Sequence, residues 1–146
     1  MTLSPQQVSD RIEIDDLLTR YAKAIDTKDY ELLDTCFIPD ADVDYVSSGG
    51  IAGKYPEVRA WLEKALAIFP VTVHSLSNSE IELDGDSARG RTLVTNPMLT
   101  RDGEGKESIF TVYAYYEDDL VRTGEGWRIA RRFERQILLD GNLPGS

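Results

Sequence analysis

The sequence predicts an α+β fold in which N-terminal helices pack on a long, strongly curved, mainly antiparallel sheet. Together they would form a cone-shaped α+β barrel that encloses a pocket. Apolar residues recur at helical spacing as far as Phe69, the period changes to that of strands after Pro70, and glycine-containing turns separate the later strands. A chain of 146 residues has the size of one domain, so residues 1–146 are expected to form a single unit.

The first two helices are marked by their caps. Ser4 can accept hydrogen bonds from the free backbone N–H groups of a helix that starts at Pro5, where proline is well suited. This helix is expected to end near Asp26. Asp29 can cap a second, short helix over Tyr30–Cys36. The apolar stripe of the first helix comprises Val8, Ile12, Leu18, Tyr21, Ala22 and Ile25.

Proline residues delimit the middle of the chain. Pro39 is expected to end the second helix, residues 42–46 alternate like a short strand, and residues 47–50 form a loop of serine and glycine. Pro56 then opens a third helix, which Pro70 closes. The apolar stripe of this helix comprises Val58, Trp61, Leu62, Ala65, Leu66 and Phe69.

Four long strands are expected in the second half, over Val71–Leu83, Ala88–Leu99, Ser108–Val121 and Trp127–Leu139. The tight connections between them contain glycine, which supplies the positive φ that hairpin turns need. Strands this long exceed the usual ~5–6 residues. Because long strands curl, the sheet and helices would enclose a small-molecule pocket. The polar or aromatic residues that suit such a lining, and equally suit an ordinary strand, are Asn78, Asn96, Tyr113, Tyr115 and Tyr116.

Charge limits the classes of partner. The chain has 26 acidic and 16 basic residues and a net charge of −10, which repels phosphate backbones and anionic membranes. We therefore expect no nucleic-acid partner and no membrane partner. The N-terminus has neither a basic start nor an apolar core, and no apolar run approaches the ~18 residues of a membrane span. A cytoplasmic location is expected.

Cys36 and His74 are the only cysteine and the only histidine. A single cysteine forms no intrachain disulfide, and one cysteine with one histidine argues against a zinc site. No calcium-loop spacing is present, so we expect no metal and no cofactor, although a site built from carboxylates alone stays open. An unperturbed histidine has a pKa of ~6.5, so histidine-dependent proton transfer would fall on His74. The alternative is a histidine that is satisfied by hydrogen bonds on a strand face.

One basic run invites a functional interpretation. Residues 131–135, Arg-Arg-Phe-Glu-Arg, alternate in charge on the last predicted strand. We interpret these charges as paired with the acidic surface, with Arg135 within reach of the cavity mouth.

Several segments, in order along almost the whole chain, resemble the SnoaL-like branch of the nuclear transport factor two-like superfamily. They are Arg20–Asp26, Lys28–Leu33, Phe37–Tyr45, Val73–Asn78, Asp84–Ala88 and Gly126–Ala130. The resemblance implies the cone-shaped fold. It does not name one reaction, because the superfamily includes dehydratases, isomerases, dehydrochlorinases, cyclases, epoxide hydrolases and non-catalytic subunits.

The resemblance is closest at individual residues. Scytalone dehydratase, hexachlorocyclohexane dehydrochlorinase and the bile-acid dehydratases share an aspartate at the end of the first helix and a histidine on the first long strand. Asp26 and His74 fall on these positions. Tyr21 matches a tyrosine of the bile-acid enzymes, and Tyr45 matches a pocket tyrosine of the dehydratases. The chain departs from scytalone dehydratase at residues 96–98, where that enzyme has a second histidine, so scytalone itself is not expected as a substrate.

The resemblance implies a cofactor-independent lyase of the dehydratase type, or an isomerase. His74 would act as the general acid/base, oriented by Asp26. Tyr21 and Tyr45 would donate hydrogen bonds to the developing enolate or the leaving hydroxyl. The substrate would be a hydrophobic small molecule with a hydroxyl or carbonyl group, contacted by Trp61, Asn96, Met98 and Tyr116. A non-catalytic ligand-binding or subunit role and a polyketide cyclase are the alternatives, and a homodimer or homotrimer is implied.

Helix geometry places a condition on this site. Five helical residues rotate by about 140°, so Tyr21 and Asp26 do not share one helix face. Both could point into one cavity only if the helix unwinds at Asp26.

Overall fold

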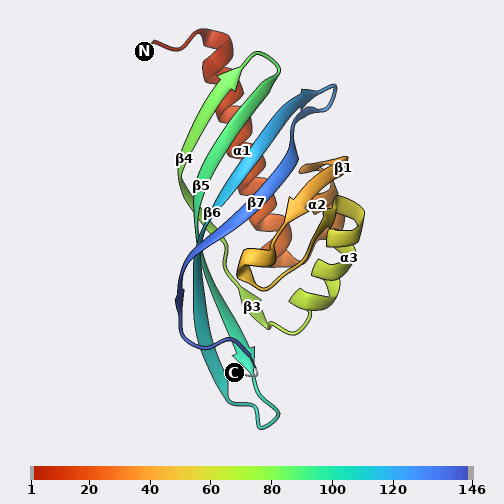
Figure 1. Ribbon diagram of the computed structural model, residues 1–146, viewed down its shortest axis with the longest axis vertical. Coiled ribbons are helices and arrows are strands. Elements are labelled where there is room, and N and C mark those ends of the chain that lie inside the picture. Colours follow the sequence, from red (N-terminus) through yellow and green to blue (C-terminus); the bar gives the residue numbers. More distant parts are fainter. Residues whose placement is uncertain (1, 145–146) are drawn as a thin grey trace.

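A seven-stranded sheet bends around a group of helices, and the two together form a half-barrel (Figure 1). The computed structural model describes residues 2–144. The strands are β1 (Phe37–Asp44), β2 (Ala52–Lys54), β3 (Val71–Thr72), β4 (Ser75–Asp84), β5 (Ser87–Arg101), β6 (Glu107–Thr123) and β7 (Gly126–Asp140). Their order is β2-β1-β7-β6-β5-β3, and β4 also pairs with β5. The pairs are antiparallel except β1 with β7, which is parallel, so the predicted α+β class is confirmed with a mixed sheet.

The first helix follows its sequence signals. Helix α1 spans Pro5–Thr27, and Ser4 and Gln7 cap each other's backbone N–H groups at its start. Lys28 takes the left-handed conformation, with φ 56°, and ends the helix. The short helix α2 follows at Tyr30–Asp34, and the side chain of its N-cap residue accepts a hydrogen bond from the helix backbone. In both helices the cap predicted from the sequence is present.

Strand β1 is longer than the short strand expected over residues 42–46, because it begins at Phe37 and includes Pro39. Phe37 pairs with Ile129 of β7, and the next paired residue of β1 is Asp42, opposite Arg131. The residues between them bulge out of the ladder with β7, so the missing N–H of Pro39 costs no ladder hydrogen bond. The second helix does end before Pro39, as expected, but the strand expected over residues 42–46 begins earlier, at Phe37, and includes Pro39.

The segment after β1 also differs in detail from the prediction. Helix α3 spans Tyr55–Leu66 and does not continue to Phe69. A single 3-10 turn, η1, occupies Val46–Ser48, and β2 is a three-residue strand that the sequence did not predict. Elements this short contain too few residues to show a period.

The expected strand Val71–Leu83 is two strands, and the break between them contains His74. Both β3 and β4 pair with β5, but His74 leaves the ladder between them. Its backbone N–H donates to the carboxylate of Asp26, at 2.8 Å, in place of a strand partner. A side chain from α1 therefore interrupts the strand at the only histidine.

Interruptions of register bend the sheet. The β4/β5 ladder shifts between Ser77 and Glu80, where Asn78 has a positive φ of 52°. The β6/β7 ladder shifts twice, after Tyr113 and again after Asp119. Such bulges increase the local twist and allow long strands to curve around the helices. The shift after Asp119 also changes which side chains of β7 face inward.

A buried polar cluster fastens α1 to the sheet at the end opposite the C-terminus. Asp10 accepts hydrogen bonds from Arg122, at 2.7 and 2.9 Å, and from the indole N–H of Trp127, at 3.2 Å. The hydrogen bonds from Arg122 are the main reason that the pKa of Asp10 falls to about 2, from an ordinary 3.8. The guanidinium of Arg122 also lies over the Trp127 ring.

We predict that Asp10→Asn lowers the free energy of unfolding by about 1–3 kcal/mol at neutral pH, because it weakens bonds to a charged group. The pKa of Asp10 is lower in the folded state, so its carboxylate stabilises the fold above pH 3.8 and this contribution is lost as the pH falls towards about 2. Urea unfolding at several pH values measures both effects. The variant should lose less stability than the wild type over that window.

Asp86→Asn is the matched control. Asp86 also pairs with Arg122, at 2.8 Å, but its side chain is exposed, so the expected loss is below about 1 kcal/mol. Equal losses for the two variants would contradict the role given to Asp10.

Candidate functional site

An apolar cavity of about 360 Å³ lies between α1, α3 and the inner face of the sheet. Much of its wall is aliphatic or aromatic, with Ile25 of α1, Leu62 and Leu66 of α3, and Phe110 and Val112 of β6. Seven of the eight residues proposed from the sequence line it: Tyr21, Tyr45, Trp61, His74, Asn96, Met98 and Tyr116. Asn78, Tyr113 and Tyr115, also considered from the sequence, are not part of the wall.

The eighth proposed residue, Asp26, lies behind His74. Its Oδ1 is 2.7 Å from Nδ1 of the imidazole, and its Oδ2 accepts the backbone N–H of His74 at 2.8 Å. The hydroxyl of Thr72 donates to Oδ1 at 3.1 Å. With Nδ1 held by Asp26, Nε2 has no hydrogen-bond partner within residues 2–144.

Burial and hydrogen bonding act in opposite directions on Asp26. Burial alone would raise the pKa of Asp26, but the hydrogen bonds from the ring and the backbone N–H of His74 outweigh it and lower that pKa. A charged carboxylate at this place favours a proton on Nδ1 and leaves Nε2 as the basic atom.

Helix α1 does not unwind at Asp26, although unwinding was the condition for Tyr21 and Asp26 to point into one cavity. Helix α1 continues to Thr27, so Tyr21 and Asp26 do point in different directions. Tyr21 reaches the cavity directly, whereas Asp26 acts on the cavity only through the ring of His74. The geometric condition therefore holds: the helix is intact at Asp26, and only Tyr21 of the two reaches the cavity.

Asn96 supports the strand break around His74. Its side-chain amide donates to the carbonyl oxygen of Val73 at 2.9 Å and lies 3.5 Å from Nδ1 of His74. Asn96 is almost fully buried on β5. It therefore holds the segment that carries the histidine.

Three tyrosine hydroxyls meet on the cavity wall. Tyr21 is 2.8 Å from Tyr45 and 3.3 Å from Tyr116, oxygen to oxygen. Burial, the largest cause, raises the pKa of each phenol well above its usual value. The hydroxyls therefore keep their protons and can donate hydrogen bonds, one to another or to a ligand.

Arg132 is a buried residue that the sequence interpretation placed on the surface. It is fully buried, and two of its guanidinium nitrogens bond Asp118 at 2.8 Å each. The guanidinium also lies 4.2 Å from the ring centre of Tyr21 and 3.9 Å from that of Tyr116. Burial works to lower the pKa of Arg132, but Asp118 prevails and raises it, so the group stays charged.

A one-residue shift explains this error. Trp127 and Ile129 face inward, and strict alternation would carry Arg131 and Arg135 inward too. The register shift at Ile129, opposite Leu120, reverses the facing, and Arg132 is buried instead. Arg135, expected near the cavity mouth, lies on the outer face and pairs with Glu117.

The same shift brings Glu134 into the cavity wall, and no pattern in the sequence had indicated it. Glu134 is 8% exposed and pairs in register with Tyr116 of β6. Burial raises the pKa of its carboxyl, against the opposing influences of Ser48, His74 and Arg132. It is the one carboxyl group among the described residues of the wall, since Asp26 lies behind His74.

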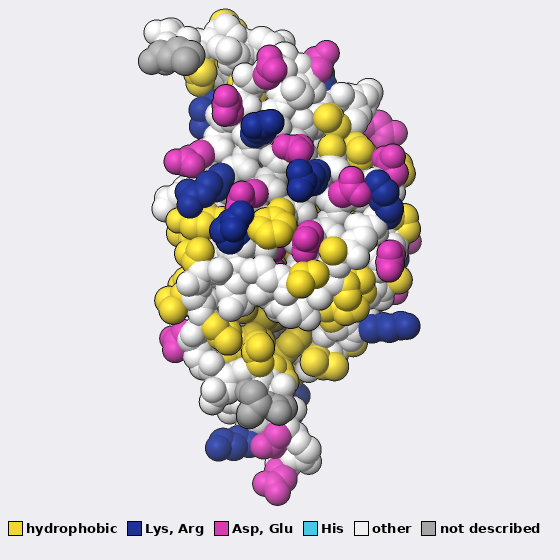
Figure 2. Space-filling model, in the orientation of Figure 1, with side chains coloured by type: hydrophobic (Ala, Val, Ile, Leu, Met, Phe, Trp, Pro, Cys, Tyr) yellow, Lys and Arg dark blue, Asp and Glu magenta, His cyan; other side chains and the backbone are white. Residues whose placement is uncertain are grey.

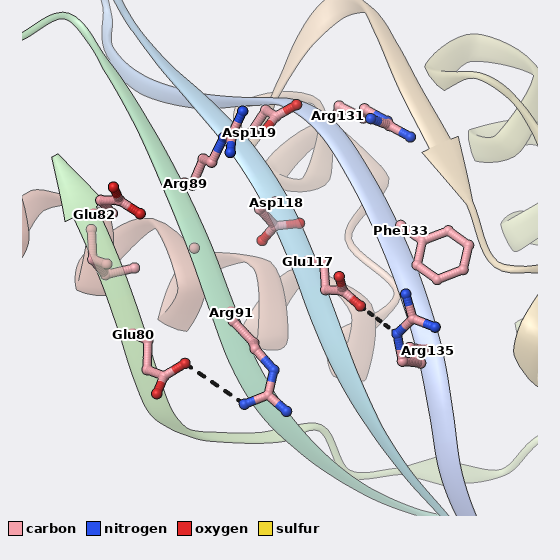
Figure 3. A pocket seen from close by; sticks show the side chains of 12 residues that line it. Glu80, Glu82, Arg89, Arg91, Glu117, Asp118, Asp119, Arg131, Phe133 and Arg135 are labelled. Carbon is pink, nitrogen blue, oxygen red and sulfur yellow. Dashed lines mark hydrogen bonds and ion pairs between the residues drawn. The ribbon is translucent and has the colours of Figure 1, made fainter. Parts of the chain in front are cut away.

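A larger hollow, of about 700 Å³, lies on the outer face of β4–β7 (Figure 3). Most of its charged side chains form ion pairs: Arg91 is 3.6 Å from Glu80, and Arg135 pairs with Glu117. The guanidinium of Arg91 also stacks on the Tyr115 ring. Because these groups are exposed and mutually neutralised, we do not place the reactive site there.

The described part of the chain shows neither a cluster of metal ligands nor a membrane-spanning helix. Within residues 2–144, no three His, Cys, Asp or Glu side chains gather in a way that would hold a metal ion. None of the helices that the structure describes is long and apolar enough to cross a bilayer.

Known proteins resemble this chain in sequence. A family model described as the SnoaL-like domain matches residues 6–133. An uncharacterised protein of Mycobacterium tuberculosis is 45% identical over 136 residues, which cover 93% of this chain and 91% of that protein.

Solved structures resemble it in fold. A protein of Novosphingobium aromaticivorans, provisionally named an aromatic ring hydroxylase, superposes with a TM-score of 0.83 at 26% identity, over 96% of each chain. Hexachlorocyclohexane dehydrochlorinase LinA-type3 of Novosphingobium barchaimii superposes with a TM-score of 0.75 at 20% identity, over 95% of this chain and 93% of that one. The second match is evidence of a shared fold alone.

We predict that Asp26→Asn changes the tautomer of His74. In the wild type the neutral ring should carry its proton on Nδ1, because the carboxylate accepts it; an amide N–H facing Nδ1 would move the proton to Nε2. Nitrogen-15 NMR of histidine-labelled protein measures this directly, and the single histidine gives an unambiguous pair of ring signals.

Thr72→Val is the control, since it removes a bond to Asp26 but leaves the carboxylate in place. Its spectrum should keep the wild-type tautomer. A wild-type ring with its proton on Nε2 would contradict the arrangement.

Proposed function

The chain belongs to the SnoaL-like domain family, and we propose that it is a cofactor-independent lyase that removes water from a hydrophobic β-hydroxy carbonyl compound. One observation carries the proposal. The imidazole of His74 lines an apolar cavity while its Nδ1 is engaged by a buried carboxylate of Asp26 at 2.7 Å. This arrangement suits a base that takes a proton from a carbon next to a carbonyl group.

The steps follow from the positions of these groups. Nε2 of His74 removes the proton, and the carboxylate of Asp26 stabilises the imidazolium that forms. Negative charge develops on the carbonyl oxygen of the substrate, where the hydroxyls of Tyr21 and Tyr45 can donate hydrogen bonds. The second step expels the hydroxyl on the neighbouring carbon and leaves a conjugated double bond.

The cavity favours a largely apolar ligand. Trp61 and Met98 contribute apolar surface, and Tyr116 and Asn96 add polar groups at fixed places. A few polar groups on an apolar wall orient a small molecule without binding it through charge. This suits a carbonyl compound with one hydroxyl group and a hydrophobic remainder.

The fold is compatible with elimination chemistry. The similar dehydrochlorinase is named for loss of hydrogen chloride, which, like dehydration, removes a proton and a leaving group. Isomerisation uses the same base and returns the proton to another carbon, so it is the second candidate reaction. A non-catalytic role would be favoured by a His74 turned away from Asp26, and the 2.7 Å contact argues against it.

We predict that His74→Ala reduces kcat/KM by about 10²–10⁴-fold, because it removes the base. The test substrate is a β-hydroxy ketone with a phenyl group on the hydroxyl-bearing carbon, and ultraviolet absorbance follows formation of the conjugated enone. Proton NMR in heavy water separately follows exchange of the proton next to the carbonyl, which reports the base step alone.

Ligand binding supplies the control for this variant. Trp61 lines the cavity, so quenching of its fluorescence by the ketone shows whether His74→Ala still binds. Turnover and proton exchange that persist at wild-type rates in the variant would refute the proposed mechanism.

We further propose that the chain forms a homo-oligomer through an outer apolar patch, defined as Val71, Leu99, Ile109, Tyr113 and Leu138. Strand register places these residues on the face of the sheet opposite the cavity. Ile109 is 63% exposed and Leu138 is 57% exposed. In the space-filling view, charged side chains are interspersed over the upper part of the visible face and hydrophobic ones gather below them (Figure 2). An exposed apolar patch of this kind is typical of a surface that another chain covers.

Ile109→Glu should therefore convert the oligomer into monomers, because a charge would have to be buried. Light scattering coupled to size-exclusion chromatography measures the mass. Ile12→Glu, at an exposed position of α1, is the control and should leave the mass unchanged. A monomeric wild type would overturn this proposal and leave the proposed reaction untouched.

A further inference from the structure

The cavity wall carries one imidazole and one carboxyl group, and the proposed mechanism uses only the imidazole. Among the described residues that line the cavity, these are His74 and Glu134. The other polar side chains there are phenols, a serine, a tryptophan and an amide. In dehydration a base alone is insufficient, since hydroxide is a poor leaving group and departs readily only when it receives a proton.

The surroundings of Glu134 favour a carboxyl group that holds a proton. It is 8% exposed and forms no ion pair within the described part of the chain. The nearest cation on its own strand face, Arg132, has two of its nitrogens bound to Asp118. Burial is the main cause that raises the pKa of Glu134, which brings its carboxyl closer to the range in which it can donate a proton near neutral pH.

The charged and polar groups around Glu134 come from several elements. Arg132 lies two residues earlier on β7, Tyr116 is its register partner on β6, and Ser48 approaches from η1. His74 faces it from the segment between β3 and β4, and a positive charge there favours the carboxylate. An imidazolium formed at His74 would therefore promote loss of the proton from Glu134 at the moment when the leaving group needs it.

We propose that Glu134 is the general acid of the site and protonates the departing hydroxyl of the substrate. This proposal rests on the dehydration proposed above. Glu134 and His74 line the same cavity, one with a carboxyl group and one with an imidazole whose Nδ1 is occupied by Asp26. The cavity thus offers an acid and a base to one ligand. A β-hydroxy carbonyl compound, whose leaving hydroxyl needs an acid, is therefore a better match for this cavity than a substrate that only isomerises.

The proton and electron balance of this step closes without a further reactant. The carbon–hydrogen bond breaks, its proton goes to Nε2 of His74, and its electron pair is held on the carbonyl oxygen as an enolate. The electrons then return to form the carbon–carbon double bond as the carbon–oxygen bond breaks, and the carboxyl proton of Glu134 joins the leaving oxygen as water. A proton passing from the imidazolium to the carboxylate through that water restores both groups.

The other donors on the wall are poorer acids. The phenols of Tyr21, Tyr45 and Tyr116 have pKa values raised well above normal by burial, so they donate hydrogen bonds but hold their protons. Arg132 does not line the cavity, and Asp118 holds it in its charged form. Glu134 is the one carboxyl among the described lining residues.

The experiment compares two leaving groups in the variant Glu134→Gln, which keeps the size and the hydrogen-bonding ability of the side chain but cannot donate a proton readily. One substrate is the phenyl-bearing β-hydroxy ketone, and the other is its β-acetoxy analogue, whose acetate leaves without protonation. We expect kcat for the hydroxy ketone to fall by about 10²–10⁴-fold and kcat for the acetoxy ketone to change less than about 10-fold. Exchange of the proton next to the carbonyl should persist.

Glu117→Gln is the matched control, because it makes the same change on the outer face of the neighbouring strand. It should leave both substrates unaffected. Trp61 fluorescence quenching and thermal unfolding establish that Glu134→Gln folds and binds.

The outcomes separate the two proposals. Equal losses for both leaving groups, or no loss for either, would overturn the role of Glu134 while His74-dependent proton exchange still supports the base. If the wild type shows no exchange and no turnover, or if both persist in His74→Ala, the proposed function itself fails.

Discussion

A fully buried guanidinium is the constraint on which the inner structure depends. Arg132 has no exposed surface, and an unpaired ion at such a place would cost several kcal/mol. Asp118 binds two of its nitrogens, and the rings of Tyr21 and Tyr116 lie against the guanidinium. These contacts join α1 to β6 and β7, so they set the separation of helix and sheet that leaves space for the cavity.

The same contacts determine which polar groups face the cavity. Because Arg132 occupies the ring faces of Tyr21 and Tyr116, their hydroxyls meet each other, and that of Tyr21 also meets Tyr45 on the cavity wall. The charge of Arg132 is paired with that of Asp118, so we assign Arg132 a structural role and not a reactive one. Apart from the tyrosines, the ionisable groups on the wall are His74 and Glu134. Among the described residues, the one ion pair that either of them forms is that of His74 with Asp26.

Local signals in the sequence account for much of the fold. Ser4 and Pro5 mark the start of α1, and glycine marks the strand turns, because caps and turns depend on a few adjacent residues. The boundaries that were wrong have non-local causes. Pro39 lies in a bulge set by the partner strand, and the strand expected from Val71 breaks where His74 bonds Asp26, 48 residues away in the sequence.

By itself the sequence determined the α+β class, and its family resemblance pointed to Asp26 and His74 as candidates. Only the tertiary structure decided which charged residues of β7 lie inside. Alternation from Trp127 would have buried the odd-numbered residues of the last strand, yet the shift opposite Leu120 buries Arg132 and Glu134 instead. A bulge arises from pairing with the neighbouring strand, so no pattern within one strand reveals it, and a slip of one residue reverses the side chains that follow as far as the next shift.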